Sequence, residues 1–189
     1  MKVLSLEQKV QKEKRRLIIT IIAIILAGVL LTTAAIVWYY WQSPADIPEQ
    51  ITVTVAWNPG SIADDVVRVM YFGETQLVLQ NIPGTHGAMG LNAVFNQEHD
   101  GTSLLSTSLS AFHEVNEMGF AESTPEDWTW WIVAYSPEYD DYYGLFVPAS
   151  VPKNRLRGLD SLISEAVLSD EFTAFLEKSG LEAVTPKRG

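Results

Sequence analysis

Near its N-terminus the chain carries an apolar segment that only a lipid bilayer or a large protein core can accommodate. Residues 17–38 read LIITIIAIILAGVLLTTAAIVW, without an ionisable side chain. At a helical rise of about 1.5 Å per residue, such a segment crosses a hydrocarbon core of roughly 30 Å. A buried helix of a soluble protein shows a polar face, whereas the hydroxyl groups here belong to threonines that can bond back to their own helix. The sequence therefore predicts a transmembrane helix over residues 17–41.

The residues that flank this segment predict its orientation. Basic side chains precede it and aromatic side chains end it: Lys9, Lys12, Lys14, Arg15 and Arg16, then Trp38, Tyr39, Tyr40 and Trp41. Basic flanks stay in the cytoplasm, and Trp and Tyr gather at the headgroups. The apolar stretch also exceeds the roughly 7 to 15 residues of a cleaved signal peptide. We expect an uncleaved, single-pass anchor in a bacterial inner membrane, with residues 1–16 as a cytoplasmic tail and the rest in the periplasm.

Charge divides the chain in the same place. Residues 1–16 carry six Lys or Arg against two Glu, so that of the net charge of −10 the remaining 173 residues hold −14. A domain this acidic is not expected to bind nucleic acid or anionic lipid, and it suits solubility, a basic protein partner or a saline habitat. Because cysteine is absent, disulfides, thiol chemistry and sulfur-ligated metals are excluded.

The remaining chain has the length of one domain and an α/β pattern. Residues 42–50 contain two prolines and predict a short stiff linker, which leaves a periplasmic domain over residues 51–189. Predicted strands cover 51–57, 76–80, 103–108, 130–135 and 143–147, and predicted helices cover 62–72, 88–97, 109–118, 154–168 and 170–179. Alternation of this kind predicts a mixed or parallel sheet flanked by helices.

A series of motifs in this domain resembles one known family. The matching stretches, in order, are residues 56–68, 81–90, 100–105, 125–128, 144–152 and 175–182. The second is an intact Asn-x-Pro-Gly-x-x-Gly-x-x-Gly loop, and the third begins with Asp-Gly and ends with Leu-Leu. Together they resemble the periplasmic substrate-binding proteins of tripartite tricarboxylate transporters, the Bug-type family of organic-acid receptors. The resemblance covers residues 51–185.

The chain departs from that family in its length. The resemblance implies two lobes that close on a carboxylate ligand, and a soluble part about twice as long as this one. Here the six residues EYDDYY between Pro137 and Gly144 stand where the second lobe would be. We therefore predict one periplasmic-binding-protein-like lobe and half of a binding cleft.

The resemblance also implies where a ligand would bind. Family members hold ligand carboxylates largely through backbone N–H groups of two turns, which here contain Asn58, Gly60 and Ser61, and Ser106, Thr107 and Ser108. The second glycine of the first turn is replaced by Ser61, and the turn proline is replaced by Ala56. These positions predict either a retained organic-acid site or turns with a purely structural role.

Other candidate sites are weak. The loop GTHGAMG lacks the spacing of a dinucleotide or P-loop motif, and His86, His99 and His113 are too far apart in the chain for the usual metal-site signatures. Asp64 and Asp65 diverge as neighbours on a helix and are interpreted as helix-start charges. No nucleophile and base pair is evident, so we expect neither enzymatic activity nor a cofactor.

Aromatic residues concentrate around the missing lobe. The residues considered for a protein interface are Trp128, Trp130, Trp131, Tyr139, Tyr142 and Tyr143. Alternation along the predicted strand places Trp128 and Trp130 on one face and Trp131 on the other, so at least one ring should reach the surface. Core filling and a docking patch both remain open, since exposed Trp and Tyr are favoured at interfaces.

The leading functional hypothesis is a non-catalytic accessory or scaffolding subunit. It would bind inner-membrane protein subunits through the anchor and the periplasmic domain, within a transport, respiratory or photosynthetic complex. The alternative is a tethered receptor that binds small organic acids, such as di- or tricarboxylates, for a transporter or sensor.

Overall fold

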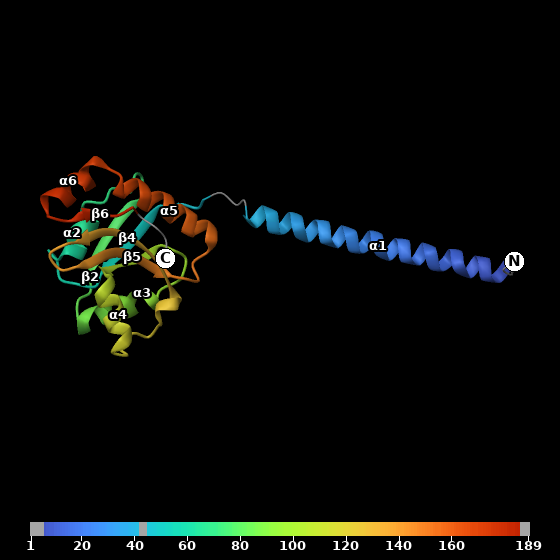
Figure 1. The fold of residues 1–189 in the computed structure, drawn as a ribbon, viewed down its shortest axis with the longest axis horizontal. Coiled ribbons are helices and arrows are strands. Elements are labelled where there is room, and N and C mark those ends of the chain that lie inside the picture. The colour runs from blue at the N-terminus through green and yellow to red at the C-terminus, as the bar shows by residue number, and fades with distance from the viewer. Residues whose placement is uncertain (1–5, 42–44, 186–189) are drawn as a thin grey trace. The chain divides into compact units, whose positions relative to one another are not determined.

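The structure is a computed structural model that describes residues 6–41 and 45–185 (Figure 1). The chain divides into two units, residues 1–44 and residues 45–189, of which the second is named the C-terminal domain. The first unit contains helix α1 (Leu6–Trp41), which begins before the predicted transmembrane segment and includes all five basic residues of its flank. Helix continues there because the flank contains good helix formers such as Leu, Glu, Gln, Lys and Arg.

Helix α1 has the length and composition that a membrane span needs. Its residues Glu13–Val37 form the one described helix that is long and apolar enough to cross a bilayer. The hydroxyl of Thr32 donates to the carbonyl of Gly28 at 3.0 Å, so this polar group is satisfied within the helix. The side chains of the predicted aromatic belt, residues 38–41, lie outside the described ones.

The C-terminal domain is built on one mixed sheet of six strands. The strands are β1 (Gln50–Val55), β2 (Gln76–Asn81), β3 (Ser103–Ser108), β4 (Trp128–Ser136), β5 (Asp141–Pro148) and β6 (Glu182–Ala183). Their order is β2-β1-β3-β5-β4-β6. β1 pairs in parallel with β2 and β3, and the other pairs are antiparallel. The predicted α/β class is confirmed, and the sheet is mixed.

Helices cover both faces of this sheet (Figure 1). One face packs against α2 (Ile62–Arg68), α5 (Lys153–Val167) and α6 (Asp170–Lys178). The other packs against α3 (Ala88–Phe95) and α4 (Leu109–Glu117). Two short 3-10 helices, η1 (Thr85–Gly87) and η2 (Pro125–Asp127), precede α3 and β4. In Figure 1, α5 and α6 lie above the sheet and α3 and α4 lie below it.

A tight hairpin stands where the resemblance placed a second lobe. Residues 137–140 form the turn that joins β4 to β5, and Asp140 in it adopts a positive φ of 50°. Both strands extend beyond the predicted 130–135 and 143–147 because they pair with each other along their length, with a bulge between Ile132 and Ala134. The two-residue β6 was not predicted, since so short a strand has no detectable periodicity.

The described end of the predicted linker is attached to the C-terminal domain. Asp46 N donates to the carbonyl of Asn154 at 3.0 Å, and its carboxylate lies 3.2 Å from Arg155 Nη2. This close approach depends on Gly158, where an added Cβ would lie 2.2 Å from the carbonyl oxygen of Asp46. Asp46 and the start of Ile47 therefore lie against α5, whereas residues 42–44 lie outside the described part of the chain.

A Gly158→Ala variant tests this attachment. In a helix, alanine is normally more stable than glycine by about 1 kcal/mol, so the clash with Asp46 must reverse the usual effect. We expect amide hydrogen exchange at Asp46 to accelerate at least about tenfold, because its hydrogen bond to Asn154 is lost. Ser161→Ala, an exposed position on the same helix, is the control and should leave that exchange unchanged. Unaltered exchange in Gly158→Ala would contradict the packing of Asp46 on α5.

Candidate functional site

The connections that follow β1 and β3 leave the sheet toward opposite faces. These two strands are parallel neighbours, but β1 leads to α2 on one face of the sheet and β3 leads to α4 on the other. The two loops therefore diverge and leave a crevice between them. In open α/β sheets, ligands bind at such a topological switch point.

A cleft lies at this switch point. It has a volume of about 210 Å³ and is lined by Trp57, Ser61, Ile62, Ala63, Ser108 and Tyr143. Three elements contribute these residues: the loop and start of α2, the end of β3, and β5. The volume falls below the roughly 300 to 1,000 Å³ of typical small-molecule sites. The cleft can therefore receive a group the size of one amino-acid side chain.

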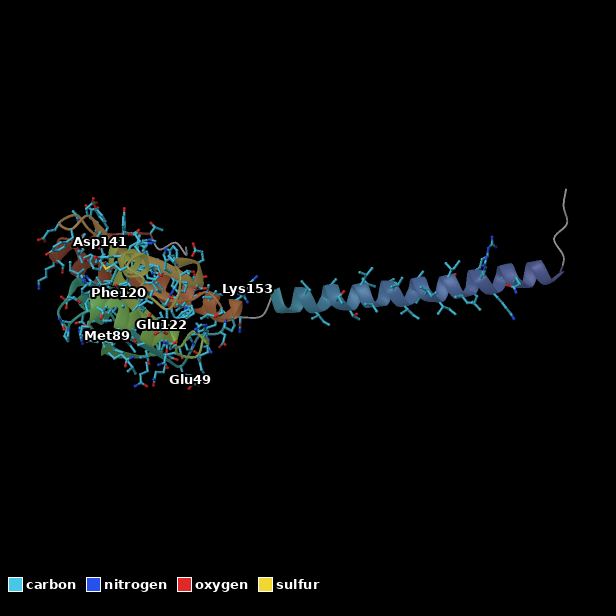
Figure 2. The ribbon with its side chains drawn as sticks, turned by 90° about the horizontal axis from the view of Figure 1, so that it is seen from below. Glu49, Met89, Phe120, Glu122, Asp141 and Lys153 are labelled. Atoms are coloured by element: carbon cyan, nitrogen blue, oxygen red, sulfur yellow. The ribbon has the colours of Figure 1, made fainter. Side chains whose placement is uncertain are left out.

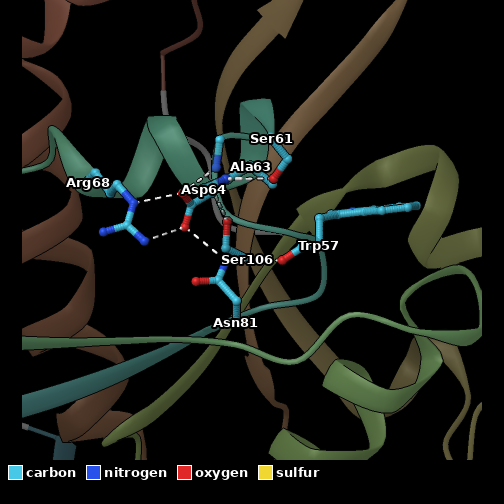
Figure 3. A network of polar contacts seen from close by, with 8 residues as sticks. Trp57, Ser61, Ala63, Asp64, Arg68, Asn81 and Ser106 are labelled. Atoms are coloured by element: carbon cyan, nitrogen blue, oxygen red, sulfur yellow. Dashed lines mark hydrogen bonds and ion pairs between the residues drawn. The ribbon is translucent and has the colours of Figure 1, made fainter.

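The carboxylate of Asp64 holds together the loop after β1 and the start of α2, which form one side of the cleft (Figure 3). Its residue is 1% exposed and accepts hydrogen bonds from Gly60 N at 2.8 Å, Arg68 Nε at 2.7 Å and Asn81 Nδ2 at 2.9 Å. Burial raises the pKa of Asp64, but the hydrogen bonds from Arg68, Gly60 and Asn81 outweigh burial and hold this pKa below its ordinary value. Asp64 is thus a buried, ionised carboxylate rather than only a helix-start charge.

The sequence contains a signal for this role of Asp64. The spacing Ser61-x-x-Asp64 is that of a capping box, and the Ser61 hydroxyl accepts from Asp64 N at 3.3 Å. Asp64 and Arg68 are also four residues apart, the spacing at which opposite charges meet on one face of a helix. Of the hydrogen bonds to Asp64, only the one from Asn81 comes from a distant part of the chain, the end of β2.

In the first turn, backbone donors that the resemblance implied for a ligand form hydrogen bonds within the protein. Asn58 and Gly60 are exposed, yet Gly60 N donates to Asp64 and the Asn58 carbonyl accepts from Ser61 N at 3.2 Å. Ser61 is half-buried and is the one of these three residues that lines the cleft. The resemblance implied that backbone N–H groups of this turn hold a ligand, whereas those of Gly60 and Ser61 bond to the chain itself.

The second turn is mostly structural. Ser106 is buried and donates to the carbonyl of Ala63 at 2.9 Å, which ties β3 to α2. Thr107 is buried, and its hydroxyl oxygen accepts from Trp57 Nε1 at 3.3 Å, which fixes the indole between the two loops. Ser108 caps the N-terminus of α4 and lines the cleft. Of the six predicted ligand residues, the structure therefore brings Ser61 and Ser108 together in the cleft.

A carboxylate that the sequence analysis did not single out occupies the start of α4. Asp141, the first residue of β5, accepts from Ser110 N at 3.1 Å through Oδ1 and from the Ser110 hydroxyl through Oδ2. Ser110 Oγ in turn lies 3.3 Å from Ser108 Oγ. Helix N-termini attract anions, and here the chain supplies the anion itself.

Comparison with solved structures identifies the fold around this cleft. A TctC solute-binding protein from Polaromonas aligns with a TM-score of 0.63 at 11% identity, over 74% of this chain and 91% of the other. The periplasmic binding protein BugD aligns with a TM-score of 0.59 at 12% identity, over 72% and 88% of the two chains. The C-terminal domain has the fold of the TctC and Bug solute-binding proteins. MatC from Rhodopseudomonas palustris, with bound malate, has the same fold, with a TM-score of 0.59 at 11% identity over 71% and 90%.

Neither the protein-family models nor the curated proteins match the sequence. The likeness that these comparisons find is therefore one of structure, at 11–12% sequence identity.

Two of the predicted interface residues belong to the core of this TctC-like domain. Trp128 is 3% exposed and Trp131 is 1% exposed, and their indole N–H groups donate to Ser123 Oγ at 2.8 Å and Asp160 Oδ1 at 2.7 Å. Their assignment to a docking patch is therefore corrected: they fill opposite faces of β4. Both rings are buried because helices cover both faces of the sheet, which alternation along one strand does not reveal.

The remaining aromatic residues lie nearer the surface. Tyr139 is 62% exposed and Tyr142 is 42% exposed, whereas Trp130 and Tyr143 are half-buried. Desolvation, followed by the charges of Asp141 and Tyr139, raises the pKa of Tyr143 to about 12. Tyr143 is neutral at physiological pH and lines the cleft.

The histidines form no centre among the described residues. No group of three or more His, Cys, Asp or Glu side chains in that part of the chain could hold a metal ion. His99 bonds to the carbonyl of Phe95 at 2.8 Å and to the hydroxyl of Ser150, and His86 lies 3.9 Å from Glu114. These contacts explain His86 and His99 as structural residues, and His113 lies within α4 with its ring centroid 5.7 Å from that of Phe112.

Proposed function

We propose that this chain is a non-catalytic, membrane-anchored periplasmic subunit of an inner-membrane protein complex. The observation that carries the proposal is the hairpin at residues 137–140, which joins β4 directly to β5. In the family that the sequence resembles, a second lobe closes over the ligand. One lobe leaves a bound molecule solvated on one side, whereas small-molecule sites bury most of their ligand. A partner protein supplies the missing surface in this proposal.

The chemistry of the cleft supports a protein partner over a small acid. Donors of both turns already bond to the chain's own carboxylates, Asp64 and Asp141, and are not available to an acid. The exposed rings of Tyr139 and Tyr142 add flat, amphipathic contact area beside the hairpin. The solute-binding fold is thus reused as a platform for protein binding.

The first unit supplies the membrane attachment in this proposal. Helix α1 is compatible with a single span, and the basic residues before it favour a cytoplasmic N-terminus. The C-terminal domain would then lie in the periplasm of a bacterium, next to transport, respiratory or photosynthetic subunits.

Purification in mild detergent tests this proposal. We expect the full chain to co-migrate with other membrane subunits in native gels and in native mass spectrometry. A Tyr139→Ala/Tyr142→Ala variant should lower the recovered complex, while Tyr71→Ala, another exposed aromatic at 67%, is the control and should not. If only free monomer is recovered, at detergent concentrations that preserve known membrane complexes, the proposal is refuted.

A receptor for organic acids is the second candidate. It is favoured by the position of the cleft at the switch point and by the fold shared with the malate-bound MatC. Calorimetric titration of the full chain with malate and citrate decides between the two functions. Binding to the folded state must raise the melting temperature, so an unchanged melting temperature at millimolar ligand excludes this candidate.

A further inference from the structure

We infer that the cleft binds a cationic side chain, lysine or arginine, of a protein partner and excludes carboxylates. The inference rests on the proposed function, because it names the group by which such a partner is held. It departs from the organic-acid ligand that the resemblance implies. Three features of the described residues support it: the aromatic walls, the charge at the rim and the prior occupation of the anion donors.

The walls of the cleft suit the stem and head of a long basic side chain. Trp57 and Tyr143 line it together with Ile62 and Ala63, so most of its lining is aromatic or aliphatic. The bond from Trp57 Nε1 to Thr107 fixes the indole before a ligand arrives. Lysine and arginine bury their methylene stems on apolar surface, and their charged heads are attracted to aromatic faces. The hydroxyls of Ser61 and Ser108 can accept from the charged head.

Among the described residues, Asp141 at the rim of the cleft has no cationic partner. It bonds to Ser110, whose hydroxyl lies 3.3 Å from that of the lining residue Ser108. Asp141 and Tyr143 are two residues apart on β5 and therefore face the same side of the sheet. In the described part of the chain, the hydrogen bonds to Asp141 come from neutral donors, the N–H groups of Ser110 and Tyr142 and the Ser110 hydroxyl. The charge is thus held in place but not neutralised. Asp141, which is labelled in Figure 2, is half-buried, so part of it remains open to an approaching group.

The same arrangement works against an acidic ligand. A carboxylate entering the cleft would meet the charge of Asp141, and Ser110 N at the start of α4 already bonds to Asp141. Gly60 N, in the opposite turn, already bonds to Asp64. An acid would therefore gain few donors and meet a like charge. A cation meets an attractive charge, and the −14 carried beyond residue 16 draws it toward the domain.

Titration of the full-length chain in detergent micelles, with ¹⁵N-labelled tryptophan, tests the inference. The probes are N-acetyl-arginine amide, the pentapeptide acetyl-Ala-Ala-Arg-Ala-Ala-amide and malate, and the readout is the indole N–H signal of Trp57, assigned with Trp57→Phe. We expect both arginine probes to shift this signal, the pentapeptide more tightly, and malate to leave it unchanged. Asp141→Asn should weaken arginine binding about tenfold, the loss expected for one partly desolvated charge contact.

Asp140→Asn is the matched control for Asp141→Asn. Asp140 is the neighbouring hairpin carboxylate, it bonds to Tyr135 OH at 2.7 Å, and its positive φ suits asparagine. The substitution removes the same charge, and the arginine affinity should change less than about twofold, because screening weakens distant charges. Equal weakening by both variants would reduce the effect to net charge and overturn the site.

Two other outcomes also overturn the inference. One is a shift of the Trp57 signal by malate with no shift by the arginine probes. The other is equal affinity for N-acetyl-arginine amide and for the pentapeptide. That result would indicate that the cleft binds a small solute rather than a side chain of a protein. This titration uses the isolated chain, whereas the proposed function is tested by co-migration with membrane subunits. A negative titration would therefore overturn the inference about the cleft without deciding whether the membrane complex exists.

Discussion

Replacing Trp131 by alanine should lower the free energy of unfolding by about 3–5 kcal/mol, the usual cost of deleting a buried aromatic side chain. Trp131 is 1% exposed, and its indole N–H donates to Asp160 Oδ1 at 2.7 Å. The substitution removes that hydrogen bond and leaves a cavity between β4 and the helices above it. Thermal melting of the full chain, followed by far-UV circular dichroism in detergent, should show a loss of about 10 °C or more.

Tyr139→Ala is the control for Trp131→Ala. Both remove an aromatic ring from the segment around the β4–β5 hairpin, but Tyr139 is 62% exposed. Its removal should change stability by less than about 0.5 kcal/mol, as is usual for surface substitutions. Similar losses in the two variants would contradict the division between core and surface rings on which the docking surface depends.

The second large effect is expected for Asp64→Ala, which should cost about 3 kcal/mol of stability. The substitution leaves the N–H groups of Gly60, Arg68 and Asn81 without their shared acceptor. The cost stays at the lower end for a buried pair because the Arg68 side chain is 47% exposed and water can replace its partner. The same loss should perturb the Trp57 indole signal, since Asn81 also bonds to the Trp57 carbonyl at 3.0 Å. Urea unfolding of the full chain measures the change.

The neighbouring Asp65→Ala is the control, and its stability should remain within about 0.5 kcal/mol of the wild type. The two variants should also differ in acid. Because the pKa of Asp64 is lowered in the folded state, its stabilisation is complete above the unfolded pKa and is lost as the pH falls through the folded value. Below about pH 4 the wild type and Asp65→Ala should therefore lose stability more steeply than Asp64→Ala. If all three proteins lost stability equally steeply as the pH falls, the role given to Asp64 would be contradicted.

Local patterns in the sequence were sufficient for the class of the fold. The period of the apolar residues predicted each of the five long strands and each of the five helices of the C-terminal domain within a few residues of its observed bounds. The glycine loop at residues 81–90 also has a structural explanation: a Cβ at Gly90 would lie 2.9 Å from Ala56 Cα, which lets α3 pack closely on the end of β1. Such features depend on neighbours in the chain or on one element's period, and both are readable from the sequence.

The candidate site was predicted in part. The two turns that the resemblance indicated each contribute one residue to the lining of the cleft, Ser61 and Ser108. The roles within them were not readable: Ser106 and Gly60 bond to other parts of the chain rather than facing a ligand. Asp141 escaped notice because its partner, Ser110, lies 31 positions away in the sequence.

The sequence by itself determined the apolar helix, the acidic domain, the alternation of strands and helices and the shortened segment at the hairpin, since each follows from composition or short-range periodicity. Tertiary structure alone decided which donors of the two turns are already used and which aromatic rings are buried. It also decided that the cleft carries a negative rim. The reason is physical: burial and hydrogen bonding are set by residues that meet only when β1, β3 and β5 lie side by side, and no local pattern records those meetings.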